Sequence, residues 1–290
     1  MANPSTMANL HATLPTGKPI QPKRWTGTKI FSNLILLVMG AFFLLPMLWL
    51  FAASVDNSAG WQLKIPDLTD RNYIQALQPD YANALLNSLI LSLIATIVAT
   101  STAFLAAYAF SRQHIPWKGP ILLSILFLSG IPISILIVPI YKMFNYFNWL
   151  SMFPTAILLG VTALPFEIYL IKNSIDAIPL DLEEAASIEK AGTWKILYRI
   201  VIPLTMPGIA SAAIFGFVNA WGNFLIPLVL ISKAAQQPGP VRMFGFMNSV
   251  AINYGAIAAF SILYSLPVVV LYLLMARSFR SGFVLGGAVR

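Results

Sequence analysis

The chain has 290 residues, of which 58% are hydrophobic and only 10% charged, and its formal net charge is +8. A soluble domain usually carries about 25% charged residues, so a water-soluble fold is a poor match. The apolar residues occur in runs of about 20, the length that crosses roughly 30 Å of hydrocarbon. The sequence contains no cysteine, which excludes disulfides and thiolate metal sites. The composition therefore predicts an all-α, polytopic protein embedded in the lipid bilayer.

Six apolar runs predict six transmembrane helices, at residues 30–54, 84–110, 119–141, 153–172, 208–231 and 256–277. The first run is too long for the core of a cleaved signal peptide, and no small-x-small cleavage site follows it. We therefore expect it to remain as a helix. This organisation gives an N-terminal tail at 1–29, a six-helix domain at 30–277 and a C-terminal tail at 278–290.

The distribution of basic residues predicts the orientation of the chain. Thirteen fall in the two tails and in the second and fourth connections: Lys18, Lys23, Arg24, Lys29, Arg112, Lys118, Lys172, Lys190, Lys195, Arg199, Arg277, Arg280 and Arg290. The opposite side holds five: Lys64, Arg71, Lys142, Lys233 and Arg242. Cytoplasmic loops are enriched in Lys and Arg, so both termini are expected in the cytoplasm. The basic excess then reflects topology, and no nucleic-acid partner is expected.

Two spans carry a small residue at every fourth position. These stripes are Ala95, Ala99, Ala103 and Ala107 in the second span, and Gly208, Ala212, Gly216 and Ala220 in the fifth. Small side chains on one helix face allow two backbones to approach closely. The stripes are expected to pack tightly inside this chain; the alternative is that one of them faces a partner membrane subunit.

Glu167 is the acidic residue that lies well inside a span. An ionised side chain there costs about 2.5–3.5 kcal/mol, so it should face the bundle interior or water. It is either a pathway or partner contact, or a buried carboxyl bonded to a neighbouring helix. Asn219, Trp221 and Asn223 of the fifth span complete a candidate substrate path, with ordinary helix contacts as the alternative.

The fourth connection, residues 179–207, has the pattern of two short helices. Asp181 is expected to cap the first helix, and Glu183 and Glu184 suit the positive end of its dipole. Gly192 and Thr193 predict a turn and a second cap.

The second of these helices is expected to be amphipathic. Its apolar face consists of Trp194, Leu197, Tyr198 and Val201 at positions i, i+3, i+4 and i+7, with Lys195 and Arg199 on another face. Pro203 and Pro207 are expected to end the segment before the fifth span. Such a helix can lie on lipid, pack under its own bundle, or dock in a groove of a soluble partner.

The segment 183–192, followed by Val201-Ile202-Pro203-Leu204, resembles the EAA loop of ABC importer permeases. Glu184, Ala185 and Ala186 match the family's Glu-Ala-Ala, whereas Glu189 and Lys190 stand where Asp and Gly are usual. Gly192 is expected to supply the turn instead. The resemblance extends over most of the chain and is to the shorter, six-span, maltose-type subunit of the carbohydrate branch. It includes the segments Asn72-Tyr73, Asn87-Ser88-Leu89, 219–224 and 283–289.

The resemblance implies a permease subunit in the cytoplasmic (inner) membrane of a bacterium or archaeon. Its implied partners are a second permease subunit, two ATPase subunits and an extracytoplasmic solute-binding protein, which the external connection 232–255 is long enough to reach. The substrate is expected to be a sugar or oligosaccharide, including an acidic one such as alginate. The implied ATPase contacts are Glu184, Ala185, Ala186, Glu189, Lys190, Ala191 and Gly192.

The chain is not expected to be an enzyme or to bind a cofactor. It lacks a Gly-x4-Gly-Lys-Ser/Thr phosphate loop, so ATP-Mg is assigned to the partner ATPases. His11 and His114 lie outside the spans, so histidine- or cysteine-based metal or nucleophilic chemistry lacks its parts. The alternative is a secondary transporter working without an ATPase, which typically shows internal repeats or several intramembrane ionisable groups.

Overall fold

A computed structural model describes residues 27–62, 64–247 and 252–286 of the chain. These residues are mostly helical and contain two isolated β-bridges but no sheet. The chain divides into two units, Met1–Leu48 and Trp49–Arg290. Several residues used above lie outside the described residues, or their side chains do: His11, Lys18, Lys23, Arg24, Lys29, Arg277, Arg280, 283–289 and Arg290.

The expectation of six spans agrees with the helices of the described part. Five helical segments there are long and apolar enough to cross a membrane, and a bent pair supplies the sixth. Helix α1 (Gly27–Ser54) is the first, and at about 1.5 Å per residue it is roughly 42 Å long. The last is α12 (Tyr254–Gly286).

Three long helices form the centre of the second unit: α3 (Pro79–Arg112), α6 (Met152–Asp176) and α9 (Ile202–Trp221). Both small-residue stripes face this centre. The alanines of the α3 stripe are at most 1% exposed, and Ala212, Gly216 and Ala220 of α9 are buried. A Cβ on Gly160 of α6 would lie 2.7 Å from the carbonyl oxygen of Ala95, so the α3 and α6 backbones are in close approach. The stripes therefore pack inside this chain.

The third span is bent, and the expectation of one helix at 119–141 is corrected accordingly. Helix α4 (Lys118–Leu128) and the pair η2 (Ile133–Leu136) and α5 (Ile137–Tyr146) meet at 75°. The break falls at 129–132, where Pro132 lacks an amide donor and disfavours the helical conformation of the residue before it.

The fifth span begins earlier than expected. One helical run extends over Thr193–Trp221, from α8 (Thr193–Ile196) through the π turn η3 (Leu197–Val201) into α9. It then breaks at 222–224 before α10 (Leu225–Leu230). Pro203 and Pro207 lie within α9, so the expectation that they end the segment is wrong. The wide π turn contains Arg199, whose carbonyl would otherwise meet the ring of Pro203 four residues later.

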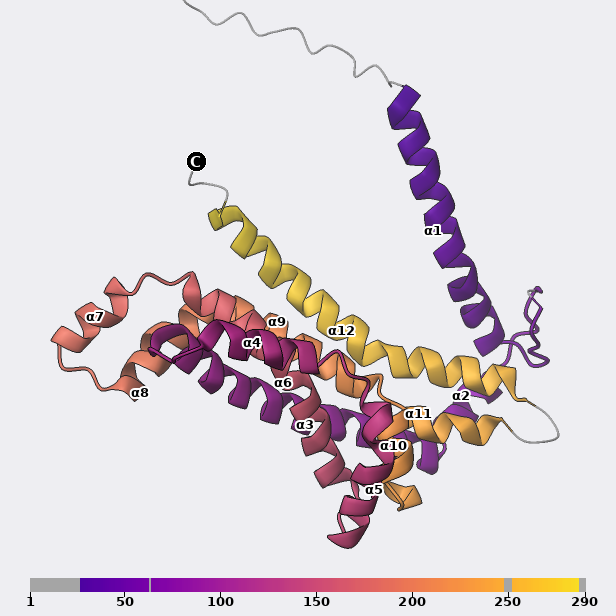
Figure 1. The fold of residues 1–290 in the computed structure, drawn as a ribbon. Helices are drawn as coiled ribbons and strands as arrows, with labels where there is room; N and C mark the ends of the chain where they lie inside the picture. Colours follow the sequence, from indigo (N-terminus) through magenta and orange to yellow (C-terminus); the bar gives the residue numbers. More distant parts are fainter. Residues whose placement is uncertain (1–26, 63, 248–251, 287–290) are drawn as a thin grey trace, which may run out of the picture. The chain divides into compact units, whose positions relative to one another are not determined.

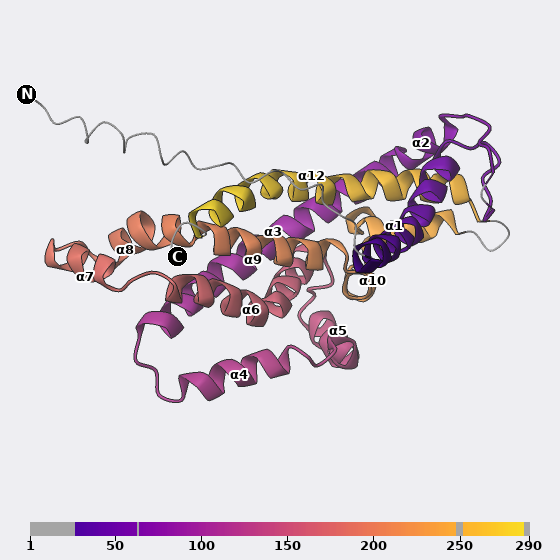
Figure 2. The ribbon, with the colours of Figure 1, turned by 90° about the horizontal axis from the view of Figure 1, so that it is seen from above.

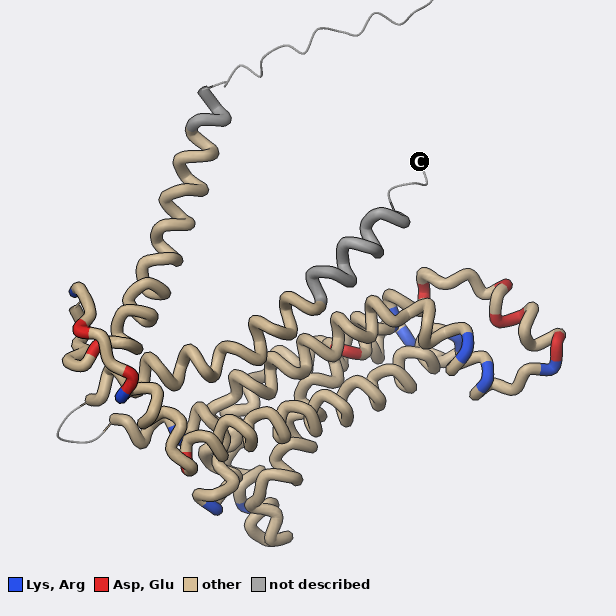
Figure 3. Tube along the Cα trace, turned by 180° about the vertical axis from the view of Figure 1, so that it is seen from behind, with Lys and Arg blue, Asp and Glu red and all other residues tan. Residues whose placement is uncertain are grey.

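The two ends of the second unit carry its short elements and most of its charge. Helices α7 (Asp181–Ile188) and α8 lie at one end of the bundle (Figures 1 and 2). At the other end lie α10, α11 (Gly239–Arg242) and α2 (Arg71–Ala76), together with η4 (Ala234–Gln236) and η5 (Met243–Phe246). Figure 3 shows charged residues gathered at these two ends and scarce between them, as a bilayer requires.

Candidate functional site

Helix α7 begins with an acidic first turn but without a side-chain cap. Asp181, Glu183 and Glu184 occupy this turn, where negative charge is favourable. Leu180 holds the N-cap position, so Asp181 is the first helical residue and not the cap that was expected.

The turn after α7 is formed by Lys190 and not by Gly192. Lys190 is left-handed at φ 60°, whereas Gly192 is extended at φ −69°, ψ 156° and caps α8. The amide of Lys190 donates to Ser187 O at 3.0 Å and that of Ala191 to Ala186 O at 3.0 Å. These two bonds define a Schellman motif, whose left-handed position is usually glycine. Lys190 thus occupies the position where the resemblance placed the usual Gly.

The expected ATPase contacts are mostly exposed. Glu184, Ala185, Glu189, Lys190 and Gly192 face outward. Ala186 and Ala191 are half-buried, because they pack against a cluster of buried residues from α3, α6 and η3. The exposed face of α7 therefore runs through Glu184 and Ala185.

Glu183 points the other way, into the chain, and the sequence alone did not reveal its role. It is only 6% exposed and pairs with Arg112 of α3 through Nε and Oε1 at 2.7 Å. The Tyr108 hydroxyl donates to its other oxygen at 2.9 Å. We call Tyr108, Arg112 and Glu183 the Glu183 cluster. One signal for this pairing was present in the sequence. Arg112 ends the second span, and an arginine that is buried there needs an acidic partner.

Arg112 also closes the end of α6. Its Nη2 donates to the carbonyls of Ile175 at 3.1 Å and Ile178 at 3.0 Å. Carbonyls at a helix C-terminus lack intrahelical partners, and a cation there is favourable. Arg112 therefore connects α3, α6 and α7.

The amphipathic face expected at 194–201 is split in two. Leu197 and Val201 are buried, whereas Trp194 is 76% and Tyr198 74% exposed. The π turn accounts for the change, because it alters the helical phase within this interval. Trp194 and Tyr198 border an apolar groove of about 620 Å³, whose other lining residues are Thr96, Ile97, Thr100, Ser101, Phe104, Leu105, Leu197, Ile202, Met206, Ile209 and Ala213.

Glu167 lies at the junction of α3, α6 and α9, fully buried. Thr100 of α3 donates to its Oε2 at 3.0 Å, while Oε1 has no partner among the described residues. Gly216 of α9 faces this carboxyl so closely that an added Cβ would overlap Oε1. In this conformation Glu167 is a carboxyl bonded to a neighbouring helix.

The other three candidate path residues have separate environments. Trp221 is buried and stacks on Phe217 and Tyr264, with ring centroids 5.4 and 4.6 Å apart. The side-chain oxygen of Asn223 accepts from the amide of Ile226 at 3.1 Å, in the first turn of α10, and Asn219 is exposed. The structure does not bring them together around one cavity with Glu167.

Asn72 and Asn87, which belong to the segments of family resemblance, hydrogen-bond backbone carbonyls at the end of the bundle opposite α7. Asn72 donates to the carbonyls of Ala53, Ser54 and Asp56, at 3.5, 3.2 and 2.9 Å, and so caps the end of α1. Asn87 donates to Ala235 O at 2.8 Å and Gln237 O at 3.2 Å. These bonds hold the start of the 232–255 connection, of which 248–251 lie outside the described residues.

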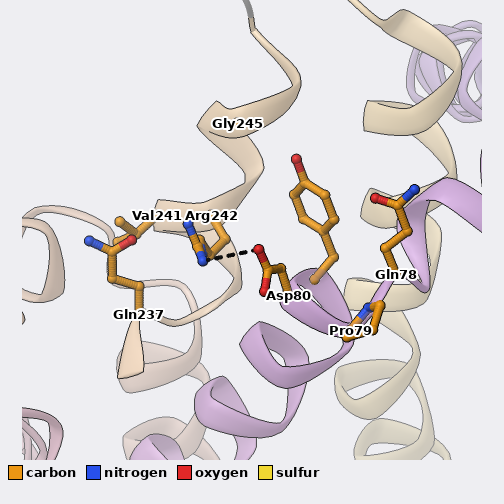
Figure 4. A pocket seen from close by; sticks show the side chains of 8 residues that line it. Gln78, Pro79, Asp80, Gln237, Val241, Arg242 and Gly245 are labelled. Atoms are coloured by element: carbon orange, nitrogen blue, oxygen red, sulfur yellow. Dashed lines mark ion pairs between the residues drawn. The ribbon is translucent and has the colours of Figure 1, made fainter. Parts of the chain in front are cut away.

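A polar pocket of about 770 Å³ lies beside this connection, between the start of α3 and α11 (Figure 4). In it Arg242 faces Asp80, with Nη2 and Oδ2 3.6 Å apart. The remaining lining residues are Gln78, Pro79, Tyr81, Gln237, Val241 and Gly245.

Comparison with known proteins relates the chain to one family. Residues 99–281 match the family described as "Binding-protein-dependent transport system inner membrane component". The sulfoquinovosyl glycerol transport system permease protein SmoH of Agrobacterium fabrum is 30% identical over 94% of each chain. The trehalose transport system permease protein SugB of Mycobacterium tuberculosis is 31% identical over 88% of this chain and 94% of its own. The galactooligosaccharides transport system permease protein GanQ of Bacillus subtilis is 29% identical over 89% and 94%.

Solved structures share the fold. The chain is similar to one from a bacterial ABC transporter involved in the import of the acidic polysaccharide alginate, with TM-score 0.74 and 20% identity. That match covers 89% of this chain and 99% of the other. A chain of the alginate transporter in complex with its pentasaccharide-bound periplasmic protein matches with TM-score 0.63 and 16% identity, over 86% and 93%.

Proposed function

Because the chain belongs to the family of binding-protein-dependent transport system inner membrane components, we propose that it forms half of the sugar pathway of an ABC importer. It is a multi-pass membrane permease of this family. The proposal adds a second permease subunit, two ATPase subunits that bind ATP-Mg, and an extracytoplasmic binding protein. A sugar or oligosaccharide substrate is supported by the relatives, whose names specify sulfoquinovosyl glycerol, trehalose and galactooligosaccharides.

One observation supports the coupling to an ATPase most directly. The EAA-like segment forms a short helix, α7, at one end of the bundle, with Glu184 and Ala185 facing outward. It leads through one turn into a helical run that continues to Trp221. A soluble partner that grips α7 would therefore act on a membrane helix. The proposed orientation places this end, and both termini, in the cytoplasm, in line with its basic residues.

The named relatives are all transport-system permeases, so they lend no support to a secondary transporter. The chain's own part in the mechanism is to bind the ATPase, to line the pathway with its partner subunit, and to move. ATP hydrolysis belongs to the partner.

The test is purification of the tagged chain from cells that co-express its neighbouring genes. We expect an ATPase to co-purify, and proteoliposomes of the complex to take up sugar only with ATP and the binding protein. Ala185→Trp should reduce both ATPase retention and uptake, because Ala185 is exposed on the face of α7 that the proposal assigns to the partner. Ala185 is a better target than Ala186, which packs partly on its own chain.

Gln113→Trp is the matched control, since Gln113 is exposed at the same end of the bundle but outside α7. It should retain ATPase and uptake. Absence of an ATPase from the wild-type preparation, or full ATPase retention and uptake by Ala185→Trp, would contradict the proposal.

A further inference from the structure

We propose that the Glu183 cluster is the joint through which movement of α7 reaches the membrane helices, with Glu183, Arg112 and Tyr108 as positioning residues. This inference rests on the proposed function, because it assumes that an ATPase holds the outer face of α7. It assigns different tasks to two adjacent glutamates: Glu184 faces the partner, and Glu183 anchors the helix to its own chain.

The opposite directions of the two glutamates follow from helix geometry and burial. Successive residues on an α-helix point about 100° apart, so the two carboxylates lie on different faces of α7. Glu183 is buried and Glu184 exposed. A ligand held by Glu184 and a chain held by Glu183 would therefore lie on different sides of α7.

Both carboxylate oxygens of Glu183 accept a hydrogen bond from α3. Arg112 Nε occupies Oε1 at 2.7 Å and the Tyr108 hydroxyl occupies Oε2 at 2.9 Å. Both donors come from the last turns of α3, and bonds of this kind to a charged group are short and directional. The side-chain hydrogen bonds that connect α7 to other elements, among the described residues, all end on Glu183. A helix of eight residues is not stable alone, so these hydrogen bonds, together with the packing of Ala186, position α7.

Side-chain hydrogen bonds also connect the ends of α3 and α6, next to the Glu183 cluster. Arg112 holds the carbonyls of Ile175 and Ile178 at the end of α6. Ser111, next to it on α3, donates to Asp176 of α6 at 2.6 Å, and Lys172 pairs with the same carboxylate. Displacement of Glu183 is therefore transmitted to α3 and α6 together. These helices carry the Thr100–Glu167 bond deeper in the bundle and pack against α9.

The experiment uses the complete importer in proteoliposomes and measures sugar taken up per ATP hydrolysed, alongside ATPase retention during purification. Glu183→Gln and Tyr108→Phe should retain the ATPase but lower uptake per ATP by about 2- to 30-fold, the range of changes seen along coupling networks. Glu184→Gln should instead release the ATPase. A merely structural role would lower the yield of inserted protein without changing the ratio in the molecules that remain.

The absence of cysteine makes a rescue experiment specific. Tyr108→Cys combined with Glu183→Cys, in an otherwise cysteine-free complex, should be poorly coupled until a bifunctional maleimide joins the two positions. Recovery of uptake per ATP after cross-linking would support the joint, because folding is complete before the link is made.

Three results would overturn the inference. One is normal uptake per ATP in both Glu183→Gln and Tyr108→Phe, and another is cross-linking that leaves the double variant uncoupled. The third is ATPase release by Glu183→Gln to the same extent as by Glu184→Gln, which would make Glu183 a partner contact. In each case wild-type ATPase retention and uptake would still support the proposed function, so the two failures are distinguishable.

Discussion

Gly216→Ala tests whether the three central helices are held as tightly as the Glu167 junction indicates. An alanine Cβ at this position would overlap Oε1 of Glu167, which is fully buried and has no room to withdraw without giving up its bond from Thr100. Overpacking of this kind costs about 1–3 kcal/mol. Loss of the hydrogen bond adds about 0.5–1.5 kcal/mol.

The substitution also brings a gain, because alanine favours an α-helix over glycine by about 1 kcal/mol. The balance is a net destabilisation of about 0.5–3.5 kcal/mol, with the steric and hydrogen-bond losses outweighing the gain in helix propensity. We expect the apparent Tm of the purified protein, followed by fluorescence in detergent, to fall by several degrees.

Two further variants make the reasoning refutable. Gly119→Ala is the control, since a Cβ there meets nothing within 4 Å, and it should leave Tm unchanged or slightly raised. In a Glu167→Ala background, Gly216→Ala should lose its penalty because the space is free. A Gly216→Ala protein as stable as wild type, or an equal penalty in both backgrounds, would show that Glu167 is not held tightly against Gly216.

Two other outcomes are expected. Lys190→Gly should preserve coupling and change the apparent Tm little. Glycine relieves about 1–2 kcal/mol of left-handed backbone strain, which is partly offset by about 0.5–1 kcal/mol of conformational entropy that glycine loses on folding. A clear loss of uptake per ATP would show that the lysine side chain itself is required. Burial alone would raise the pKa of Asp56, but Lys64 and the amides of Asp67 and Ser58 outweigh it and hold the pKa below its ordinary value of 3.8. The stabilisation is therefore complete above about pH 4 and lost as pH falls through the lowered pKa. Proteolysis of 57–68, corrected for the protease's own activity at each pH, should accelerate below that pH in wild type but not in Asp56→Asn. Equal acid sensitivity in both would contradict this.

The spans could be predicted from the sequence because the bilayer imposes a length on every apolar run. Their interruptions were harder to place. Pro132 breaks the third span, whereas Pro203, which a π turn precedes, leaves the fifth continuous, and Pro207 lies inside α9 without a break. Proline alone does not determine the outcome, since the carbonyl four residues earlier can be displaced by a local change in helix type.

The EAA-like loop was recognisable from its residues, but its internal organisation was not. Propensity placed the turn at Gly192, while the Schellman motif uses Lys190. Nothing local distinguishes Glu183 from Glu184. The difference comes from Arg112, 71 residues earlier in the chain, which is brought to α7 only by the folded bundle. The sequence likewise allowed Trp221 to stack on a sugar ring. In the fold it stacks on Tyr264, a contact between distant parts of the chain that the sequence pattern does not reveal.

The continuous helical run Thr193–Trp221 is long enough to act as a lever. Its 29 residues, at about 1.5 Å each, make a rod of roughly 43 Å. A tilt of about 10° about one end of such a rod shifts the other end by roughly 7 Å. When the rod pivots at its α8 end, the greatest displacement falls at its far end, which carries Asn219 and Trp221. A partner that rotates α7 by a small angle would then displace the opposite end of this helical run by more than the loop itself moves.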